Sequence, residues 1–420
     1  MPVVRNSAHK TIILIALILA GEIIFFLPFV LARVFRPTLL KVLDITNFEL
    51  GTYFSVYGVV AMISYFFGGA LADRFPSRNL MSYSLWLTAL GGLIMAIIPS
   101  HNILPILYGF WGFTTIFLFW AALIRATREW GGAGFQGRAF GLLEGGRGLA
   151  AALLATLTLF IFSKFTGGEA ITSAELRNVS FQVVILVTSA ITFLIGVLIW
   201  VAIPKGITKI EESEQPTVAK ILKLVRMPTI WMQAFIIVCA YVGYKITDDY
   251  SLYANEVLGF NEVAAAGVGT MALWMRPLFA VLAGFLADRF DGSKVTIGCF
   301  LLMCIGGLFI YLGVLNHIAW LALTLLSTTL IGVYGIRGIY FALMEEASIP
   351  IVSTGTAVGI MSVVGFTPDV FMSPLMGFLL DTFPGAQGHQ YVFLVLMGFS
   401  LVGLLVSILF VREVRKNRGS

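Results

Sequence analysis

The sequence contains few charged residues, few cysteines and few histidines. Only 12% of its 420 residues are charged, 59% are hydrophobic, and the mean hydropathy is +0.94. Soluble domains average about 25% charged and about 45–50% apolar residues, so a water-soluble chain of this length could not keep its apolar side chains away from solvent. The shortage of charge therefore predicts an all-α polytopic membrane protein.

Cysteine and histidine are too sparse for several kinds of chemistry. Cys239, Cys299 and Cys304 lie in apolar runs without paired spacing, which favours neither a disulfide framework nor a zinc site. The four histidines are expected at helix ends or in loops. The sequence has no P-loop and no Ser-His-Asp order typical of a hydrolase. We therefore expect no enzymatic activity, no metal, no cofactor and no step driven by ATP.

Apolar runs of about 20 residues, the length of a helix that spans a bilayer, occur twelve times. Polar or turn-rich stretches such as 99–102 and 131–134 separate them. The predicted spans cover residues 11–34, 50–72, 80–98, 103–125, 139–163, 180–203, 229–256, 262–287, 295–314, 318–341, 355–380 and 391–411.

The basic residues are distributed unevenly between the predicted loops. Most of the 27 Lys and Arg residues lie in segments that face the cytoplasm if the amino terminus is inside. Because cytoplasmic loops carry an excess of basic residues, we expect both termini in the cytoplasm. The same bias explains the net charge of +5 without a nucleic-acid partner. We expect a lipid-embedded protein of the plasma (inner) membrane and, in the absence of an oligomerisation motif, a monomer.

Two stretches recur about half the chain length apart, which indicates an internal repeat. Residues 69–75 (GALADRF), after the second span, return as 284–290 (GFLADRF) after the eighth, and 137–141 (GRAFG) return as 355–359 (GTAVG). A charged stretch separates six spans from six. We therefore expect a six-helix bundle at 1–203, a cytoplasmic linker at 204–228 and a second six-helix bundle at 229–420.

This organisation resembles the major facilitator superfamily of secondary transporters. The resemblance rests on twelve spans as six plus six, the charged linker and the duplicated Gly-x-Leu-Ala-Asp-Arg loop, and it covers essentially the whole chain. It implies two bundles that rock around a binding site at the membrane midplane. Arg and Glu residues in spans four and five resemble the branch that moves organic anions and organophosphates.

The resemblance also implies a gating role for the duplicated loop. Contacts of its charged residues would lock one conformation and break in another, whereas the alternative is a static cap that anchors the topology. The predicted gating residues are Asp73, Arg74, Asp288 and Arg289.

Charged residues within the spans are the candidates for binding and coupling. A charge at the centre of a membrane helix costs about 2.5–3.5 kcal/mol, so such residues should face the interior of a bundle, where they can pair. The predicted substrate-binding residues are Arg147, Arg276, Arg337 and Lys245, with the aromatic residues Tyr57, Tyr241, Trp274 and Tyr334. The predicted proton-coupling residues are Asp369, Asp248, Asp249, Glu22 and Glu144.

Helical spacing makes two local ion pairs available. Lys245 can pair with Asp248 at i,i+3 or with Asp249 at i,i+4, which leaves one acid to titrate. Glu144 and Arg147 are also i,i+3. Each set is consistent with substrate gating or coupling and, equally, with a purely structural pair.

The sequence thus predicts a secondary active transporter of a small organic anion, which works by alternating access. Its driving force would be a proton gradient or exchange against another anion. An alternative is an exporter of amphipathic or cationic compounds (a drug/proton antiporter), in which the acids bind substrate. A minor alternative is a sensor or scaffold built on a transporter fold.

Overall fold

The computed structural model describes residues 7–131, 136–167, 171, 173–204, 222, 224–313, 318–349 and 354–419. The regular secondary structure of these residues is entirely helical. Eleven described stretches are long and apolar enough to cross a membrane, and a further helix of 28 residues, α3, coincides with the predicted second span. The all-α prediction is therefore confirmed.

The chain divides into two compact units. Unit 1 contains the helices as far as α8 together with Phe260–Trp274, and unit 2 contains the helices from α10 to α11 and the chain from Met275 onward. The long helix α12 (Glu262–Phe290) is continuous, so its first part belongs to unit 1 and its second part to unit 2.

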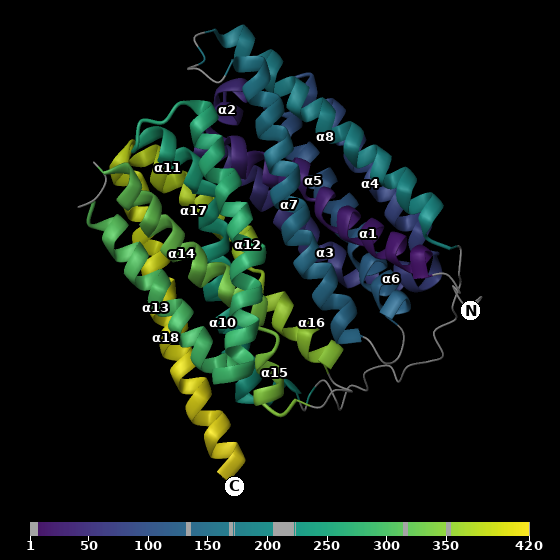
Figure 1. The fold of residues 1–420 in the computed structure, drawn as a ribbon, viewed down its shortest axis with the longest axis vertical. Coiled ribbons are helices and arrows are strands. Elements are labelled where there is room, and N and C mark those ends of the chain that lie inside the picture. The colour runs from purple at the N-terminus through teal and green to yellow at the C-terminus, as the bar shows by residue number, and fades with distance from the viewer. Residues whose placement is uncertain are drawn as a thin grey trace. The chain divides into compact units, whose positions relative to one another are not determined.

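Unit 1 is a bundle with an apolar core. Its helices are α1 (Ser7–Ile23), η1 (Phe26–Val30), α2 (Leu31–Leu43), α3 (Asn47–Arg74), α4 (Ser77–Ala96), α5 (Ile103–Gly112), η2 (Phe113–Trp120), α6 (Ala121–Gly131), α7 (Gln136–Thr166) and α8 (Ala174–Ala202). Helices α4 and α8 run side by side, and α1 packs against α7 and α8 (Figure 1). Ala266 and Leu273 of α12 are buried in the same core.

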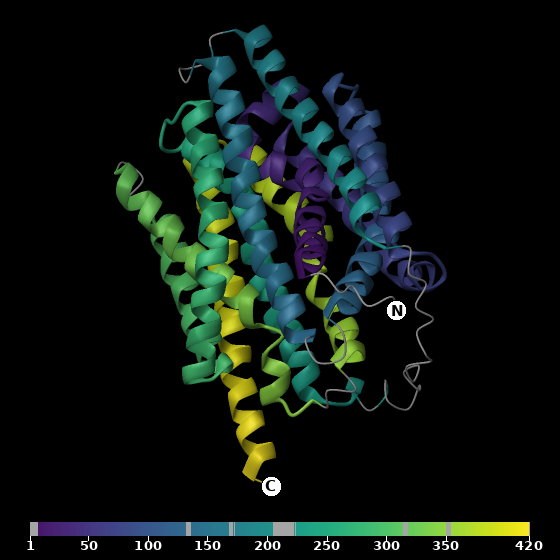
Figure 2. The ribbon, with the colours of Figure 1, turned by 45° about the vertical axis from the view of Figure 1, so that its right-hand side comes forward.

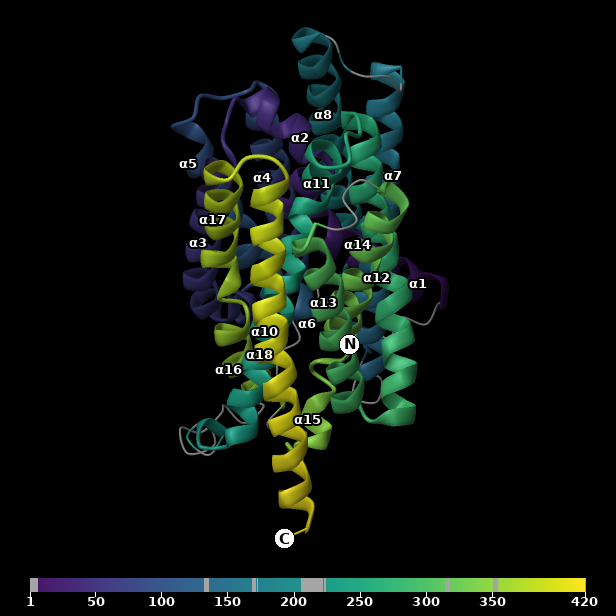
Figure 3. The same ribbon diagram turned by 90° about the vertical axis from the view of Figure 1, so that its left-hand side faces the viewer.

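Unit 2 is a second bundle. Its helices are α10 (Pro228–Ile246), η3 (Thr247–Asp249), α11 (Tyr250–Glu256), the second part of α12, α13 (Gly292–Tyr311), α14 (Ala319–Ile339), α15 (Leu343–Glu346), α16 (Thr354–Gly365), α17 (Pro368–Thr382) and α18 (Ala386–Gly419). Helix α13 packs against α14 (Figure 2) and against α18, the long yellow helix of Figure 3. Helix α10 packs against α16, α17 and α18.

Local sequence explains where several helices begin and end. Thr46 and Glu49 form a capping box at the start of α3, in which each side chain accepts a hydrogen bond from the other residue's backbone N–H. Pro228 begins α10 at a position where its missing N–H costs nothing. Asp44 ends α2 in the left-handed region, with φ of 52°.

The predicted first span, 11–34, ends too early. The apolar helical stretch runs from His9 to Leu43. Arg33 and Arg36, on either side of the predicted end, are both buried, and Arg36 Nε donates a hydrogen bond to Asn47 Oδ1 at 3.0 Å. The helical stretch therefore continues past two buried arginines.

The other predicted spans coincide with helices, and three of them are not regular α-helix throughout. The fourth span comprises α5, η2 and α6, the seventh comprises α10, η3 and α11, and the eleventh comprises α16 and α17. Most of the predicted linker, residues 205–221 and 223, lies outside the described residues.

Close packing of α13 against α14 depends on a glycine. A Cβ at Gly332 of α14 would collide with the backbone carbonyl of Cys299 and the side chain of Met303, both on α13, whereas a Cβ at Gly398 of α18 would meet nothing within 4 Å. The first site therefore has no room for a methyl group.

We expect Gly332→Ala to lower the free energy of unfolding by about 1–3 kcal/mol, because the extra methyl group forces two helices apart. Gly398→Ala is the matched control and should be neutral or slightly stabilising, since it removes a mid-helix glycine without a clash. Thermal unfolding of both purified variants in detergent measures the difference. Equal unfolding temperatures for the two variants would contradict the packing of α13 against α14.

Candidate functional site

Breaks within membrane-length helices place polar residues inside unit 2. Helix α10 ends at Ile246, a short turn of 3₁₀-helix holds Asp248 and Asp249, and α11 then continues the span. The α16–α17 span is interrupted before Pro368, so that Asp369 lies in the first turn of α17. Transporters use interrupted helices of this kind at their binding sites, because the freed backbone and polar side chains line a cavity.

These breaks bring Lys245 between two aspartates. Lys245 Nζ lies 3.5 Å from Asp248 Oδ2 and 3.6 Å from Asp369 Oδ1, and the lysine side chain is only 2% exposed. The hydroxyl of Tyr241 donates to Asp369, with both carboxylate oxygens at 3.1 Å. Lys245, Asp248, Asp369 and Tyr241 are here named the Lys245 cluster. It gathers one cation and two carboxylates from α10, η3 and α17.

Arg337 lies beside this cluster but contacts aromatic rings. Its guanidinium carbon lies 3.8 Å from the centre of the Tyr244 ring and 5.7 Å from that of Tyr241. Among the described residues no acid forms an ion pair with Arg337, and its Nη1 is buried without a hydrogen-bond partner. Arg337, Tyr241, Tyr244 and Asp369 are each half-buried, so an aromatic-lined cation borders a partly accessible space.

The remaining candidates of unit 2 lie close to this site or are buried in its walls. Tyr334 is fully buried, with its ring centre 6.5 Å from that of Tyr244. Arg276 is 7% exposed and lies directly before Pro277 within α12. A proline inside a helix removes one backbone hydrogen bond and favours a bend.

Unit 1 contains a second charged cluster. Arg147 Nη1 donates to Glu144 Oε1 at 2.6 Å, and Arg147 Nε lies 3.4 Å from Glu22 Oε2. The guanidinium carbon also lies 5.7 Å and 5.6 Å from the ring centres of Phe25 and Trp120. Glu22 is buried, whereas the Glu144 side chain is 54% exposed. These five residues, the Arg147 cluster, combine one cation with two carboxylates and two aromatic rings.

A π-helical segment helps to form this cluster. Trp120 is the last residue of η2, and η1 begins directly after Phe25. π-Helical turns occur frequently at functional sites, because the extra residue per turn re-aims neighbouring side chains.

Two aromatic candidates make contacts within unit 1. The Tyr57 hydroxyl lies 2.5 Å from Thr115 Oγ1 and its ring packs edge-on against Phe29. The indole N–H of Trp274 donates to Thr156 Oγ1 at 2.9 Å.

The structure describes the side chains of three of the four predicted gating residues. Arg74, Asp288 and Arg289 are exposed at the ends of α3 and α12, and Arg289 lies over the ring of its neighbour Phe290. The side chain of Asp73 lies outside the described residues.

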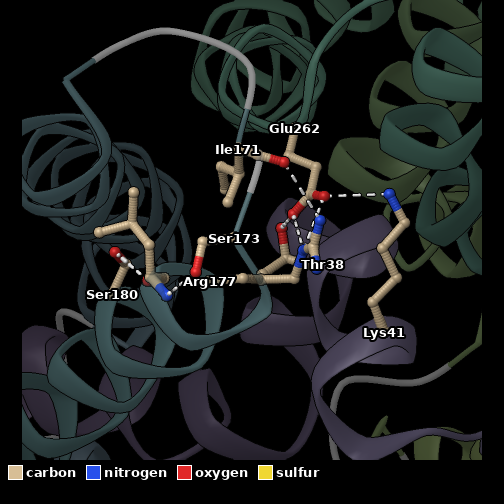
Figure 4. Close-up of polar contacts among 8 residues, drawn as sticks. Thr38, Lys41, Ile171, Ser173, Arg177, Ser180 and Glu262 are labelled. Atoms are coloured by element: carbon tan, nitrogen blue, oxygen red, sulfur yellow. Dashed lines mark hydrogen bonds and ion pairs between the residues drawn. The ribbon is translucent and has the colours of Figure 1, made fainter.

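A four-residue cluster that no sequence pattern predicts surrounds Glu262, which is 6% exposed. Its carboxylate accepts hydrogen bonds from Thr38 Oγ1 at 2.7 Å, from Lys41 Nζ at 3.0 Å and from Arg177 Nε at 2.9 Å (Figure 4). The contacts hold the first turn of α12 to α2 and α8 within unit 1. Glu262 was overlooked because an acid at a predicted helix start ordinarily serves only the helix end.

His389 was also overlooked. It was expected at a helix end or in a loop, and it does lie near the start of α18, but it is fully buried. Its Nδ1 lies 2.7 Å from Asp249 Oδ2, so Asp249 of η3 pairs with His389 of α18, and Asp248 pairs with Lys245.

Comparisons with known proteins agree with this architecture. Inner membrane protein YqcE of Escherichia coli (strain K12) is 28% identical, over 97% of this chain and 95% of that protein. Inner membrane protein YihN of the same organism is 25% identical, over 96% of this chain and 95% of that protein. An uncharacterized MG294 homolog of Mycoplasma pneumoniae is 24% identical, over 93% of this chain and 90% of that protein.

Solved structures share the fold. A bacterial homolog of the human lysosomal transporter Spinster, inward-facing and unoccupied, superimposes with a TM-score of 0.75 at 15% identity, over 98% of each chain. The nucleoside transporter NupG superimposes with a TM-score of 0.68 at 13% identity, over 96% of this chain and 98% of that chain. These similarities confirm the predicted fold of twelve membrane helices.

The family model of the Major Facilitator Superfamily matches residues 13–367, which is most of the chain. Together with its membrane-length helices and its relatives named as inner membrane proteins, this match identifies the chain as an integral multi-pass membrane transporter that belongs to the Major Facilitator Superfamily.

Proposed function

We propose that this transporter is a secondary active carrier of a small organic anion, which it binds at Arg337 and moves by alternating access. The observation that carries the proposal is the environment of Arg337. The guanidinium sits over the Tyr244 ring, its Nη1 has no hydrogen-bond partner among the described residues, and no described acid pairs with it.

Arginine cannot shed its proton to escape this situation. The face of an aromatic ring stabilises a cation by only about 0.5–2 kcal/mol, which is small beside the cost of a buried charge. A carboxylate or phosphate of a substrate would supply two parallel charge-assisted hydrogen bonds to the planar guanidinium. An anionic ligand is therefore the partner that the site favours.

The nearby acids support this assignment because they are already engaged. Asp248 and Asp369 both contact Lys245, and Asp369 also accepts from Tyr241. Lys245 thus balances one of the two negative charges in its cluster, and neither carboxylate forms an ion pair with Arg337 among the described residues. Tyr241 connects the two features, since its hydroxyl binds Asp369 and its ring faces Arg337.

This connection offers a route for coupling. Proton binding to Asp369 would weaken its hold on Lys245 and Tyr241, and the released groups could then attract the substrate anion. Exchange against a second anion at Arg337 is the other route that we consider. The two routes differ in whether transport responds to a pH gradient.

A second candidate function is export of an amphipathic cation. The Arg147 cluster favours it, because two carboxylates surround one arginine, Phe25 and Trp120 lie next to them, and the Glu144 side chain is half exposed. A positively charged aromatic compound would find both a counter-ion and a ring surface there.

We further propose that the Glu262 cluster fixes one state of the transport cycle. It holds the first part of α12 on unit 1, while Pro277 lies shortly after the point where α12 passes into unit 2. Release of Glu262 from Lys41 and Arg177 would free this part of the helix. The charged loop residues Asp73, Arg74, Asp288 and Arg289 remain proposed gating residues.

Replacing Arg337 should weaken binding of organic acids. Arg337→Ala removes a charge-assisted contact, which contributes about 1.5–3 kcal/mol, so affinity should fall about ten- to a hundredfold. Arg337→Lys should recover only part of the loss, since an ammonium cannot bind bidentately. Isothermal titration calorimetry with lactate, succinate, gluconate and glycerol 3-phosphate on the purified protein measures the change.

The exposed Arg412 on α18 provides the matched control, and Arg412→Ala should bind the acids as the wild type does. An acid that binds wild type and Arg337→Ala with the same affinity would place the site elsewhere. Tight binding of organic cations instead of acids would favour the exporter.

Removing the charge of Glu262 should destabilise the protein markedly. Glu262→Gln leaves Arg177, 17% exposed, without its counter-ion, and breaking such a buried pair costs about 3 kcal/mol. The control is Lys294→Gln, which breaks the exposed pair with Asp291 and should cost less than about 1 kcal/mol. Thermal unfolding of both variants tests this; similar losses would show that the Glu262 cluster does not hold α12.

A further inference from the structure

His389 is fully buried, and both of its ring nitrogens face carboxylates. Nδ1 lies 2.7 Å from Asp249 Oδ2 and Nε2 lies 3.2 Å from Glu256 Oε2. Asp249 is completely buried, whereas the Glu256 side chain is 36% exposed. The three residues come from η3, α11 and α18 and are here named the His389 triad.

This geometry requires a bound proton. A neutral imidazole has one N–H donor and one acceptor nitrogen, and an ionised carboxylate can only accept. Both contacts can be hydrogen bonds only if the ring carries a second proton or one carboxyl group carries it. Loss of that proton would leave a nitrogen lone pair facing a carboxylate in a buried position, which is unfavourable.

Other titratable side chains lie near the triad. The Tyr253 ring packs edge-on against the imidazole with 5.5 Å between ring centres, and the hydroxyl of Tyr250 is engaged by Thr329. Asp381 of α17 comes shortly before α18 in the chain, and Asp369 of the same helix pairs with Lys245. Among the described residues no three His, Cys, Asp or Glu side chains are placed to hold a metal ion.

The triad also leads from the surface toward the Lys245 cluster. Glu256 is its exposed end, and Asp249 is its buried end. Asp249 is the chain neighbour of Asp248, whose Oδ2 lies 3.5 Å from Lys245 Nζ. A change in the charge of Asp249 would therefore alter the electrostatic environment of the pair between Asp248 and Lys245.

We propose that Asp249, His389 and Glu256 form the binding site for the coupling proton, with Glu256 as its entrance. The proposal rests on the proposed transport function and places the coupling proton at this triad instead of at Asp369. In the empty state the ring is neutral and carries its proton on Nδ1; a proton from water binds a Glu256 oxygen and passes to Nε2, which gives the imidazolium of the loaded state. The imidazolium then gives its Nδ1 proton to Asp249 Oδ2, so that one proton has entered, one has been delivered, and the ring is neutral again.

A direct test uses nuclear magnetic resonance of protein labelled with ¹⁵N at the histidine ring nitrogens, since the chain has only four histidines. At neutral pH we expect one ring with both nitrogens in strong hydrogen bonds and with shifts of an imidazolium. His389→Gln should remove this signal, and Asp249→Asn should convert it to that of a neutral ring. His101→Gln, which alters an exposed histidine 3.9 Å from Glu49, is the matched control and should leave it unchanged. Four rings that all titrate near pH 6.5, as free imidazole does, would overturn the proposal.

Transport in proteoliposomes provides the second arm, with an acid that binds in the calorimetry as the probe. His389→Gln and the milder Glu256→Gln should retain binding and exchange of this acid at equal pH but lose accumulation driven by a pH gradient. Gradient-driven accumulation at the wild-type rate in both variants would overturn the proton site and leave anion transport standing. If the wild type neither binds nor exchanges any acid, the proposed function fails, and the resonance experiment alone decides the triad.

Discussion

The pairing of Lys245 with two aspartates is the contact on which the polar interior of unit 2 depends. An unpaired charge in an apolar bundle is costly, and here one ammonium group, 2% exposed, compensates carboxylates from two different interrupted helices. Without it, Asp248 and Asp369 would repel each other and the breaks in the α10–α11 and α16–α17 spans would lose their stabilising contact. Because Lys245 takes up these acids, Arg337 is left facing aromatic rings and is available to an anion.

Unit 1 also places its buried charges in ion pairs. Arg147 lies between Glu22 and Glu144, with two aromatic rings beside it, and Glu262 collects two cations and a hydroxyl group at the start of α12. Charged groups that neutralise one another can also separate when a new partner arrives. In a transporter that alternates between states, such contacts are suited to hold one state and to release it.

The sequence predicts local features well because they depend on helical periodicity. The spans follow from apolar runs, and the contacts of Arg147 with Glu144 and of Lys245 with Asp248 follow from i,i+3 spacing. Contacts between distant segments are harder, since the rotation of each helix about its axis decides them. Arg177 and Glu262 lie far apart in the sequence, as do Asp249 and His389, and no spacing rule connects them. The predicted first span ends too early because Arg36, which lies just beyond it, is buried, and burial cannot be read from residue type alone.

The most direct test of anion transport compares an acid with its own amide. The two molecules have nearly the same size and shape, and only the acid carries the charge that Arg337 would bind. Wild-type protein in liposomes should exchange a labelled carboxylic acid against the unlabelled acid in a saturable manner and ignore the matching amide. Exchange of the amide at the same rate as the acid, or exchange of an amine in place of both, would contradict an anion site at Arg337.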